Sequence, residues 1–149
     1  MFRGNHPAKV DEKGRLKLPA AFKQLLDAQS VTQFYITSQD GKFAEIFPLP
    51  EWEKREAMLA RHSTLNKAVK KYLNLTSYYG QQTEIDNQGR VLLPQILRGK
   101  ASLDSDVTVF GKTTHLEVHN RAIFEQNLPD NEMTDADFQV LDNILSPGS

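Results

Sequence analysis

The ten residues VDEKGRLKLP at positions 10–19 return at positions 85–94 as IDNQGRVLLP. Both copies keep the order aliphatic, Asp, two variable residues, Gly, Arg, aliphatic, one variable residue, Leu, Pro, and Asp11 lies 75 residues before Asp86. An internal repeat of this kind sets the architecture of the whole chain. The sequence therefore predicts two equivalent units, each with an arginine beside a glycine turn.

Each copy of the repeat predicts a strand, a tight turn, a second strand and a short helix. In the first copy the turn is the three-residue loop 12–14, in which Gly14 supplies the left-handed backbone that such hairpins need. Pro19 ends the second strand and suits the first turn of a helix over residues 20–26. Asp11 and Arg15 then face each other across the hairpin.

The likeness between the halves continues downstream. Two further strands are predicted in each half, at 33–37 and 44–47 with a turn at Asp40-Gly41, and at 107–110 and 116–119 with a turn at Gly111-Lys112. The repeating unit is β-β-α-β-β-α, so the predicted class is mainly β with α, built from short antiparallel strands. The predicted organisation is a first repeat at 5–54, a helical linker at 55–80, a second repeat at 81–128 and an acidic tail at 129–149.

The tail is predicted to contain one short helix. Thr134 to Asp137 resembles a capping box, and the residues after it place apolar side chains at helical spacing. These side chains are predicted to dock on the body of the chain or on a neighbouring subunit; they are Phe138, Leu141, Ile144 and Leu145.

The composition is that of a soluble globular protein. Apolar residues make up 39% and charged residues 25% of 149 positions, and there is no cysteine, which excludes disulfides and thiolate metal sites. No apolar run approaches the roughly 20 residues of a membrane span, and the N-terminus lacks the apolar core of a signal peptide. A cytoplasmic protein without a membrane partner is expected.

A net charge of −1 conceals a difference between the halves. Residues 1–74 contain 13 Lys and Arg against 8 Asp and Glu, whereas residues 75–149 contain 5 against 11. This distribution favours a basic binding surface in the first half and an acidic segment elsewhere.

The Asp-x-x-Gly-Arg motif allows two interpretations. In the first, Asp11 with Arg15 and Asp86 with Arg90 are cross-strand ion pairs that only stabilise their hairpins, by roughly 0.2–1 kcal/mol each. In the second, each aspartate holds the base of its arginine while the guanidinium projects from a stiff turn. Arginine matches guanine or phosphate with two parallel hydrogen bonds, and a two-stranded β-ribbon fits the major groove of double-stranded DNA.

Lysines strengthen the second interpretation in the first copy. Lys9, Lys13 and Lys17 are placed to bind phosphates, whereas the second copy has Glu84, Gln88 and Leu92 in those places. The second hairpin should therefore bind less strongly, although Gln88 can hydrogen-bond a base edge.

Other polar groups point to no chemistry. His115 and His119 have a ligand-like spacing, but on an extended strand they are too far apart to share a metal ion. Lys67, Lys70 and Lys71 form either a solvated helix face or auxiliary phosphate contacts. No catalytic constellation is present, so the sequence predicts no enzyme, no metal, no cofactor and no small-molecule substrate.

Taken together, the motifs resemble a known family. The paired hairpins, each followed by Leu-Pro and a helix, are similar to tandem SpoVT/AbrB-type DNA-binding domains. More closely, the chain resembles the MraZ family over roughly residues 1–128, through Met1 to Gly4, Asp11 to Pro19, Pro48 to Glu53 and Asp86 to Pro94. In the linker it has Asn66-Lys67 and Lys70-Lys71 where the family has Asn-Pro and a pair of arginines.

The resemblance implies a swapped-hairpin, double-split β-barrel in which the two halves form a pseudo-dimer. It also implies a transcriptional regulator that forms homo-oligomeric rings on the nucleoid and binds short, regularly spaced boxes upstream of its own division and cell-wall operon. The DNA-binding motif of the family falls on Asp11, Arg15, Asp86 and Arg90. The alternative is a protein-interaction module of the antitoxin type, which would use the acidic tail, and a metal-dependent enzyme using the histidines is a third and weaker hypothesis.

Overall fold

The computed structural model describes residues 1–62 and 65–146. It is a mixed α+β structure with antiparallel strands, as the repeat predicts. The first repeat supplies β1 (Phe2–Lys9), β2 (Arg15–Lys17), α1 (Ala20–Ala28), β3 (Gln33–Thr37), β4 (Ala44–Pro48) and α2 (Leu49–Ala60). After α3 (Lys67–Tyr78), the second repeat supplies β5 (Gln81–Glu84), β6 (Arg90–Leu92), α4 (Gln95–Lys100), β7 (Asp106–Thr113), β8 (His115–Asn120) and α5 (Arg121–Gln126). A short 3-10 helix, η1 (Leu128–Asn131), and α6 (Asp135–Leu145) follow.

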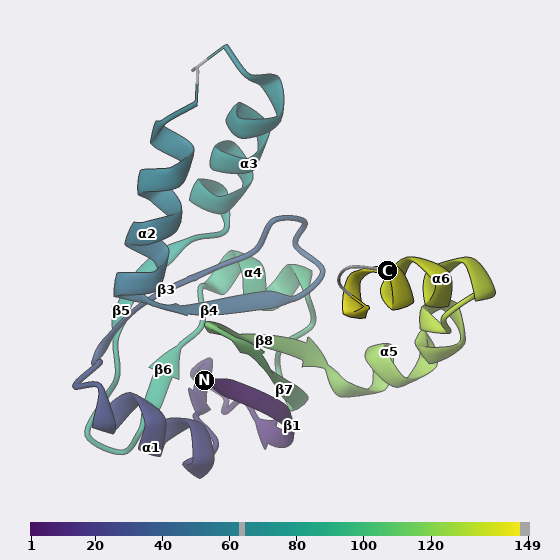
Figure 1. The fold of residues 1–149 in the computed structure, drawn as a ribbon. Coiled ribbons are helices and arrows are strands. Elements are labelled where there is room, and N and C mark those ends of the chain that lie inside the picture. The colour runs from purple at the N-terminus through teal and green to yellow at the C-terminus, as the bar shows by residue number, and fades with distance from the viewer. Residues whose placement is uncertain (63–64, 147–149) are drawn as a thin grey trace.

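The two repeats exchange strands. The main sheet has the order β1-β7-β8-β4-β3-β5, so the first strand of each repeat pairs with the β-hairpin of the other repeat. β1 lies beside β7 and β5 lies beside β3, while β4 and β8 join the halves in the middle of the sheet (Figure 1). Neither repeat completes its part of the sheet alone, because the outer strand beside each β-hairpin comes from the other repeat.

The pairing around the repeated motif differs from a simple hairpin. Within the first copy, only Val10 and Leu16 form a bridge, whereas β2 pairs with β6 of the other copy. The predicted turn is present in each copy, since the N–H of Asp11 donates to the Arg15 carbonyl and that of Asp86 to the Arg90 carbonyl. The prediction of a ribbon that each motif builds by itself was wrong, because β2 and β6 obtain their ladder across the repeat boundary. The exchanged pairing agrees with the swapped-hairpin fold that the resemblance implies.

One predicted turn was also wrong. Gly111 and Lys112 lie inside β7, where they pair with Gly4 and Arg3 of β1, and the chain turns at Thr113 instead, which has a φ of 65°. The reason is the long pairing with β1, which extends β7 beyond its apolar residues. The turn predicted at Asp40-Gly41 is confirmed, with Gly41 at a φ of 75°.

The core lies between the sheet and the helices that follow the motifs. Its largest fully buried side chains include Phe22, Leu26 and Leu97 from α1 and α4 and Phe34 and Ile36 from β3. Leu16 and Val91 close the core beneath the β2–β6 ribbon and are 0% and 1% exposed. The repeated motif thus contributes its aliphatic residue to the shared core and leaves its arginine on the opposite side of the strand.

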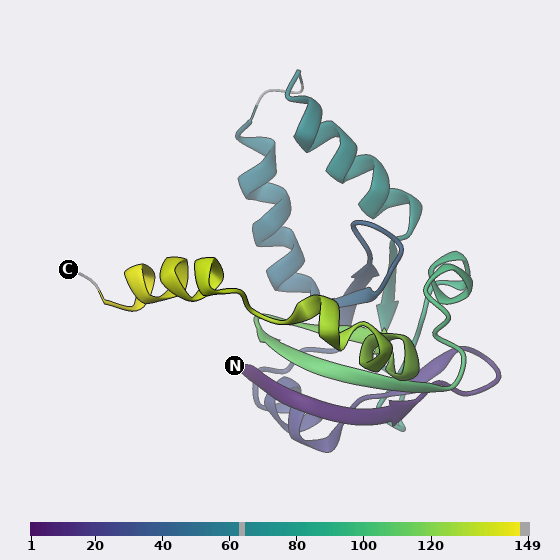
Figure 2. The same cartoon turned by 90° about the vertical axis from the view of Figure 1, so that its right-hand side faces the viewer.

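Two helical parts project from this body (Figures 1 and 2). The first, which we call the arm, consists of α2 and α3. Its base is held where Arg55 Nη1 donates to the Tyr72 hydroxyl at 3.1 Å and where the hydroxyls of Tyr35 and Thr37 donate to the Thr76 carbonyl. α2 begins at Leu49 and so crosses residue 54, the predicted end of the first repeat.

The second projecting part is the tail with α6. The predicted capping box is confirmed. The Thr134 hydroxyl accepts a hydrogen bond from the backbone N–H of Asp137, and the Asp137 carboxylate accepts one from the backbone N–H of Thr134. The apolar side chains of α6 do not dock on the body, however; Phe138 is 49% and Ile144 68% exposed. The predicted docking on the body of the chain is therefore wrong, and docking on a neighbouring subunit stays a prediction. In the described ranges, no helix combines the length and apolarity of a membrane span.

Candidate nucleic-acid interface

The first copy of the motif builds a tight turn around one carboxylate. Asp11 Oδ1 accepts hydrogen bonds from the backbone N–H groups of Lys13, at 3.0 Å, and Arg15, at 2.8 Å. Its second oxygen, Oδ2, accepts from Arg15 Nε at 2.8 Å. The Gly14 N–H donates to the Asp11 carbonyl, and Gly14 has a φ of 84°. A single aspartate therefore closes the loop and fixes the base of the arginine side chain.

The second copy repeats this geometry almost atom for atom. Asp86 Oδ1 accepts from the backbone of Gln88 and Arg90 at 2.9 Å each, and Oδ2 accepts from Arg90 Nε at 2.8 Å. Gly89 has a φ of 78°. The identical contacts explain why Asp, Gly and Arg recur while the two residues between them do not.

The hydrogen bonds keep both aspartates ionised. The backbone N–H of Arg15 is the main cause that holds the pKa of Asp11 below its ordinary value of 3.8, and Arg90 acts in the same way on the pKa of Asp86. A carboxyl group with a lowered pKa stabilises the fold at pH values above its unfolded-state pKa. This contribution is lost as the pH falls through the folded-state pKa. Both turns therefore hold their arginines at neutral and mildly acidic pH.

The exchanged strands bring the two arginines onto one surface. In the β2–β6 ribbon, Leu16 pairs with Val91 at the centre, and Arg15 and Arg90 lie on either side of this pair, opposite Leu92 and Lys17. Because side chains alternate along a strand and the central pair is buried, all four flanking side chains lie on the outer face. Diagonal neighbours of this kind are about 7–8 Å apart, which is close to two base-pair steps.

The guanidinium ends remain available for a ligand. The side chains of Arg15 and Arg90 are 31% and 23% exposed, and each uses only Nε for its aspartate. Within residues 1–62 and 65–146, the Nη1 and Nη2 groups of both arginines have no hydrogen-bond or ion-pair partner. The aspartate thus orients each arginine without occupying the two nitrogens that form its fork.

Comparison with known proteins identifies the family. The family model described as "MraZ protein, putative antitoxin-like" matches residues 1–74 and 80–142. The chain belongs to the MraZ family. A protein of Acidobacterium capsulatum named transcriptional regulator MraZ is 59% identical over 95% of this chain and 97% of its own length. Proteins with the same name from Koribacter versatilis and Salinispora arenicola are 42% and 34% identical, each over at least 97% of both chains.

The three lysines predicted for phosphate binding differ in their surroundings in this MraZ chain. Lys13 is exposed in the first turn, and Lys17 is exposed on the ribbon opposite Arg90. Lys9 is also exposed, but its ammonium lies 3.9 Å from the Asp106 carboxylate. Among the described residues, Lys13 and Lys17 form no ion pair and so contribute more positive charge to this candidate surface than Lys9 does.

The structure also brings two cations to the turns that the motif analysis missed. Arg98 of α4 packs over the first turn, so that a Cβ added to Gly14 would lie 1.9 Å from Arg98 Nη1. Lys23 of α1 lies over the second turn, 3.7 Å from a Cβ added to Gly89, but it is paired with Asp27 at 2.6 Å. Lys23 and Arg98 have the same 75-residue spacing as the motifs, so extending the repeat into the helices would have found them.

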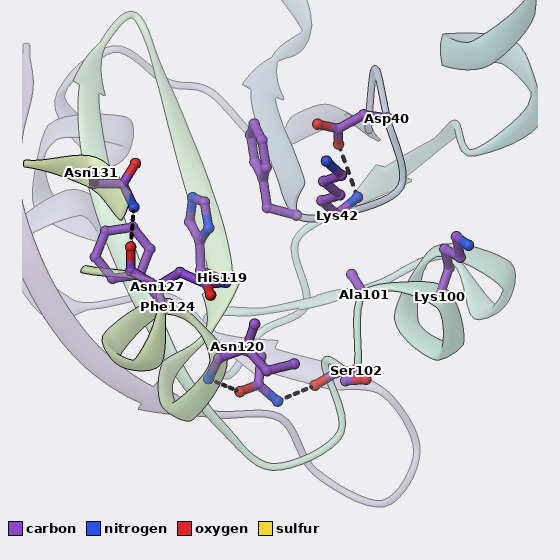
Figure 3. Close-up of a pocket in the computed structure, with 12 residues that line it drawn as sticks. Asp40, Lys42, Lys100, Ala101, Ser102, His119, Asn120, Phe124, Asn127 and Asn131 are labelled. Atoms are coloured by element: carbon purple, nitrogen blue, oxygen red, sulfur yellow. Dashed lines mark hydrogen bonds between the residues drawn. The ribbon is translucent and has the colours of Figure 1, made fainter. Parts of the chain in front are cut away.

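The histidines and the hollows of the protein offer no catalytic arrangement in the part of the chain described. His115 faces Glu45 on β4, whereas His119 contacts Glu117 and stacks on Phe43. A cavity of about 360 Å³ lies next to His119, between α4, α5 and the β3–β4 turn (Figure 3). Its polar side chains bond locally, as in the Asn120 amide that donates to the Ser102 carbonyl. This cavity lies apart from the arginine ribbon.

Proposed function

We propose that this protein is a sequence-specific regulator of transcription that binds double-stranded DNA through the β2–β6 ribbon. Arg15 and Arg90 contact the duplex, Asp11 and Asp86 orient them, and Lys13, Lys17 and, more weakly, Lys9 bind phosphates. The relatives named transcriptional regulator MraZ support the general function. The observation that carries the assignment is the outer face of the ribbon, where two oriented arginines lie diagonally across the strand pair and their Nη groups have no partner among the described residues.

The proposal includes the target and the location. The target is a set of short, regularly spaced boxes upstream of the protein's own operon of division and cell-wall genes, which the protein binds in the cytoplasm, on the nucleoid. One ribbon covers only a few base pairs, so affinity for such a region requires several ribbons on one assembly. A homo-oligomer, which carries several ribbons, is therefore suited to a region with repeated boxes.

Binding to the upstream region tests the function directly. In fluorescence anisotropy, we expect a labelled duplex of this region to bind more tightly than a shuffled duplex of equal length. The logarithm of the association constant should fall with the logarithm of salt concentration by about 0.9 per phosphate contacted. Equal affinity for both duplexes, or retention that does not respond to salt, contradicts the proposal.

The exposed apolar surfaces support assembly with further copies of the chain. A groove of about 780 Å³ between α2 and α3 of the arm is lined by Leu59, Val69 and Leu73 together with polar residues. α6 presents an apolar face and carries three aspartates but no Lys or Arg, whereas α3 carries three lysines and no Asp or Glu. We assign α6 of one copy to the arm groove of the next.

This contact uses two different surfaces of the same protein. A head-to-tail contact of this kind produces a closed ring when its rotation closes. The arm and the acidic tail then form the contacts between copies, while the β2–β6 ribbon binds DNA.

Substitutions in the contact should dissociate the assembly. Ile144→Asp in α6 and Leu73→Asp in the groove each place a charge against apolar surface, so we expect either one to reduce the mass measured by light scattering to that of smaller species. Asn143→Asp adds the same charge on the polar side of α6 and should leave the mass unchanged. An unchanged mass for both apolar substitutions contradicts the assignment.

A second candidate function is binding of a partner protein in the manner of an antitoxin. The family description names this class, and the acidic, exposed α6 is suited to a basic partner. Stoichiometric recovery of another protein in a pull-down, together with the absence of salt-sensitive DNA binding, would favour it over the regulator.

A further inference from the structure

Two glutamates and a histidine meet at the junction of the two repeats. Glu45 of β4 and Glu117 of β8 are directly opposite each other in the central strand pair, and His115 precedes Glu117 by two residues on the same face of β8. One potential ligand atom from each residue lies within 4.8 Å of the other two. The side chains are largely shielded, with 6% of Glu45, 13% of His115 and 19% of Glu117 exposed.

This arrangement is electrostatically incomplete. Glu45 Oε1 is buried and has no hydrogen-bond partner in the described structure. Its other oxygen lies 3.4 Å from His115 Nε2, close enough for an ion pair with a protonated ring, but the geometry provides no hydrogen bond. Like charges opposite each other in a sheet destabilise it, and a buried carboxylate without full compensation is costly.

Nearby cations compensate Glu117 only from a distance and leave Glu45 without a direct partner other than His115. Lys112 lies over the ring of Phe110, and Arg55 lies over the ring of Phe47. In residues 1–62 and 65–146, neither side chain forms an ion pair with Glu45 or Glu117. Burial acts to raise the pKa of Glu117. His119, Lys112 and His115 favour its ionised form, however, and hold its pKa below the ordinary value. Within the described residues, Oε1 of Glu45 still has no hydrogen-bond partner, and a cation between the two carboxylates would give it a direct partner.

The surrounding groups hold the three side chains in a form suited to a metal ion. The His115 ring stacks on Phe47, with centroids 4.5 Å apart, and its Nδ1 lies 3.4 Å from Thr114 Oγ1. With the proton on Nδ1, the lone pair of Nε2 faces Glu45. His119 Nε2 contacts Glu117 Oε1 at 3.1 Å, and Oε2 of that carboxylate has no hydrogen bond to any other described residue. Outer contacts of this kind orient ligands in metal sites.

We infer that Glu45, His115 and Glu117 bind a divalent first-row cation, for which Zn²⁺ is the test ion. One imidazole nitrogen and two carboxylate oxygens are suitable zinc ligands, and water completes the coordination. Ligands at about 2.0–2.2 Å from one ion lie roughly 3–4 Å apart, so modest side-chain rotation closes the site. Glu45 belongs to the first repeat and the other two ligands to the second, so the ion joins the two halves of the pseudo-dimer.

The test uses the full-length protein after treatment with EDTA and dialysis. Titration calorimetry with ZnCl₂ should give one ion per chain. At a free Zn²⁺ concentration of 100 times Kd, the Tm should rise by about 5–11 °C. The Co²⁺ complex should show visible absorption bands that Zn²⁺ removes.

Two variants distinguish a metal site from a plain ion pair. Glu45→Gln and His115→Gln each remove a ligand and should abolish both the calorimetric signal and the Zn²⁺-dependent rise in Tm. Without metal, Glu45→Gln should melt no lower than the wild type, because it removes one of two facing carboxylates. Glu84→Gln, which removes an exposed carboxylate of β5, should behave as the wild type.

The outcomes are decisive in both directions. If Zn²⁺ leaves the Tm of the wild type unchanged, or raises the Tm of Glu45→Gln and His115→Gln equally, the inference is wrong. A Glu45→Gln protein that melts lower than the wild type in EDTA would identify Glu45 and His115 as an ion pair only. None of these readouts involves DNA, so the result is independent of the proposed function.

Discussion

Replacing Arg15 and Arg90 together by alanine is expected to weaken binding to the upstream duplex at least 30-fold while the protein stays folded. Each well-oriented arginine contact to a base contributes about 1–3 kcal/mol, so losing two costs about 2–6 kcal/mol per ribbon. The fold should persist, because partly exposed ion pairs such as Arg15–Asp11 contribute only about 0–1 kcal/mol each. Anisotropy with the labelled duplex measures the loss, and circular dichroism and light scattering check the fold and the assembly.

A matched control removes the same charge elsewhere. Arg3→Ala combined with Arg61→Ala deletes two exposed arginines outside the ribbon and should change affinity only slightly, through net charge. If the ribbon variant binds as tightly as this control, Arg15 and Arg90 are not the contact residues and the proposed interface is wrong.

The conservative variant shows what the arginines contact. Lysine keeps the charge but lacks the planar fork, so Arg15→Lys with Arg90→Lys retains phosphate attraction and loses bidentate recognition. If the arginines bind bases, this variant should keep the salt dependence and lose its preference for the upstream duplex over a shuffled one. If they bind phosphates, it should retain most of that preference.

Gly111→Ala is expected to be strongly destabilising. An added Cβ would lie 2.2 Å from the Arg3 backbone nitrogen and 2.5 Å from the Phe2 carbonyl carbon. Both are backbone atoms of the exchanged strand β1, so the clash cannot be relieved by a rotamer change. Overpacking of this kind costs about 3 kcal/mol. For a chain of this length the Tm should fall by roughly 6–12 °C.

Gly99→Ala is the internal reference for this substitution. Gly99 lies in α4 and an added Cβ meets no atom within 4 Å. Alanine is the better helix former by about 0.5–1 kcal/mol, so this variant should melt at or above the wild-type temperature. Thermal unfolding of both variants measures the difference in Tm. Equal Tm values would show that β1 does not approach Gly111 as closely as the structure indicates.

The local features of the site could be predicted from the sequence because they depend on neighbouring residues only. Asp11, Gly14 and Arg15 act within five consecutive residues, and the capping box of α6 within four. Pro19 and Pro94 mark the ends of the strands for the same reason. The hydrogen bonds that close each turn come from residues within the motif itself.

Features that depend on distant segments could not be predicted in this way. Glycine is typical of turns, and a turn was predicted at Gly111. In the structure its missing side chain makes room for β1, which lies more than 100 positions earlier in the chain. Likewise, Glu45 and His115 are far apart in the sequence and belong to no common motif. They become neighbours only through the β4–β8 pairing. Helical spacing identified α6 but could not show that its apolar face stays exposed.

The sequence alone determined that this protein has two identical arginine turns, because hydrogen bonds between residues two to four positions apart specify each turn completely. Only the tertiary structure decided that the two turns serve one surface. Each half lacks a strand that the other supplies, and this exchange pairs β2 with β6 and brings Arg15 and Arg90 to opposite sides of the same buried Leu16–Val91 pair.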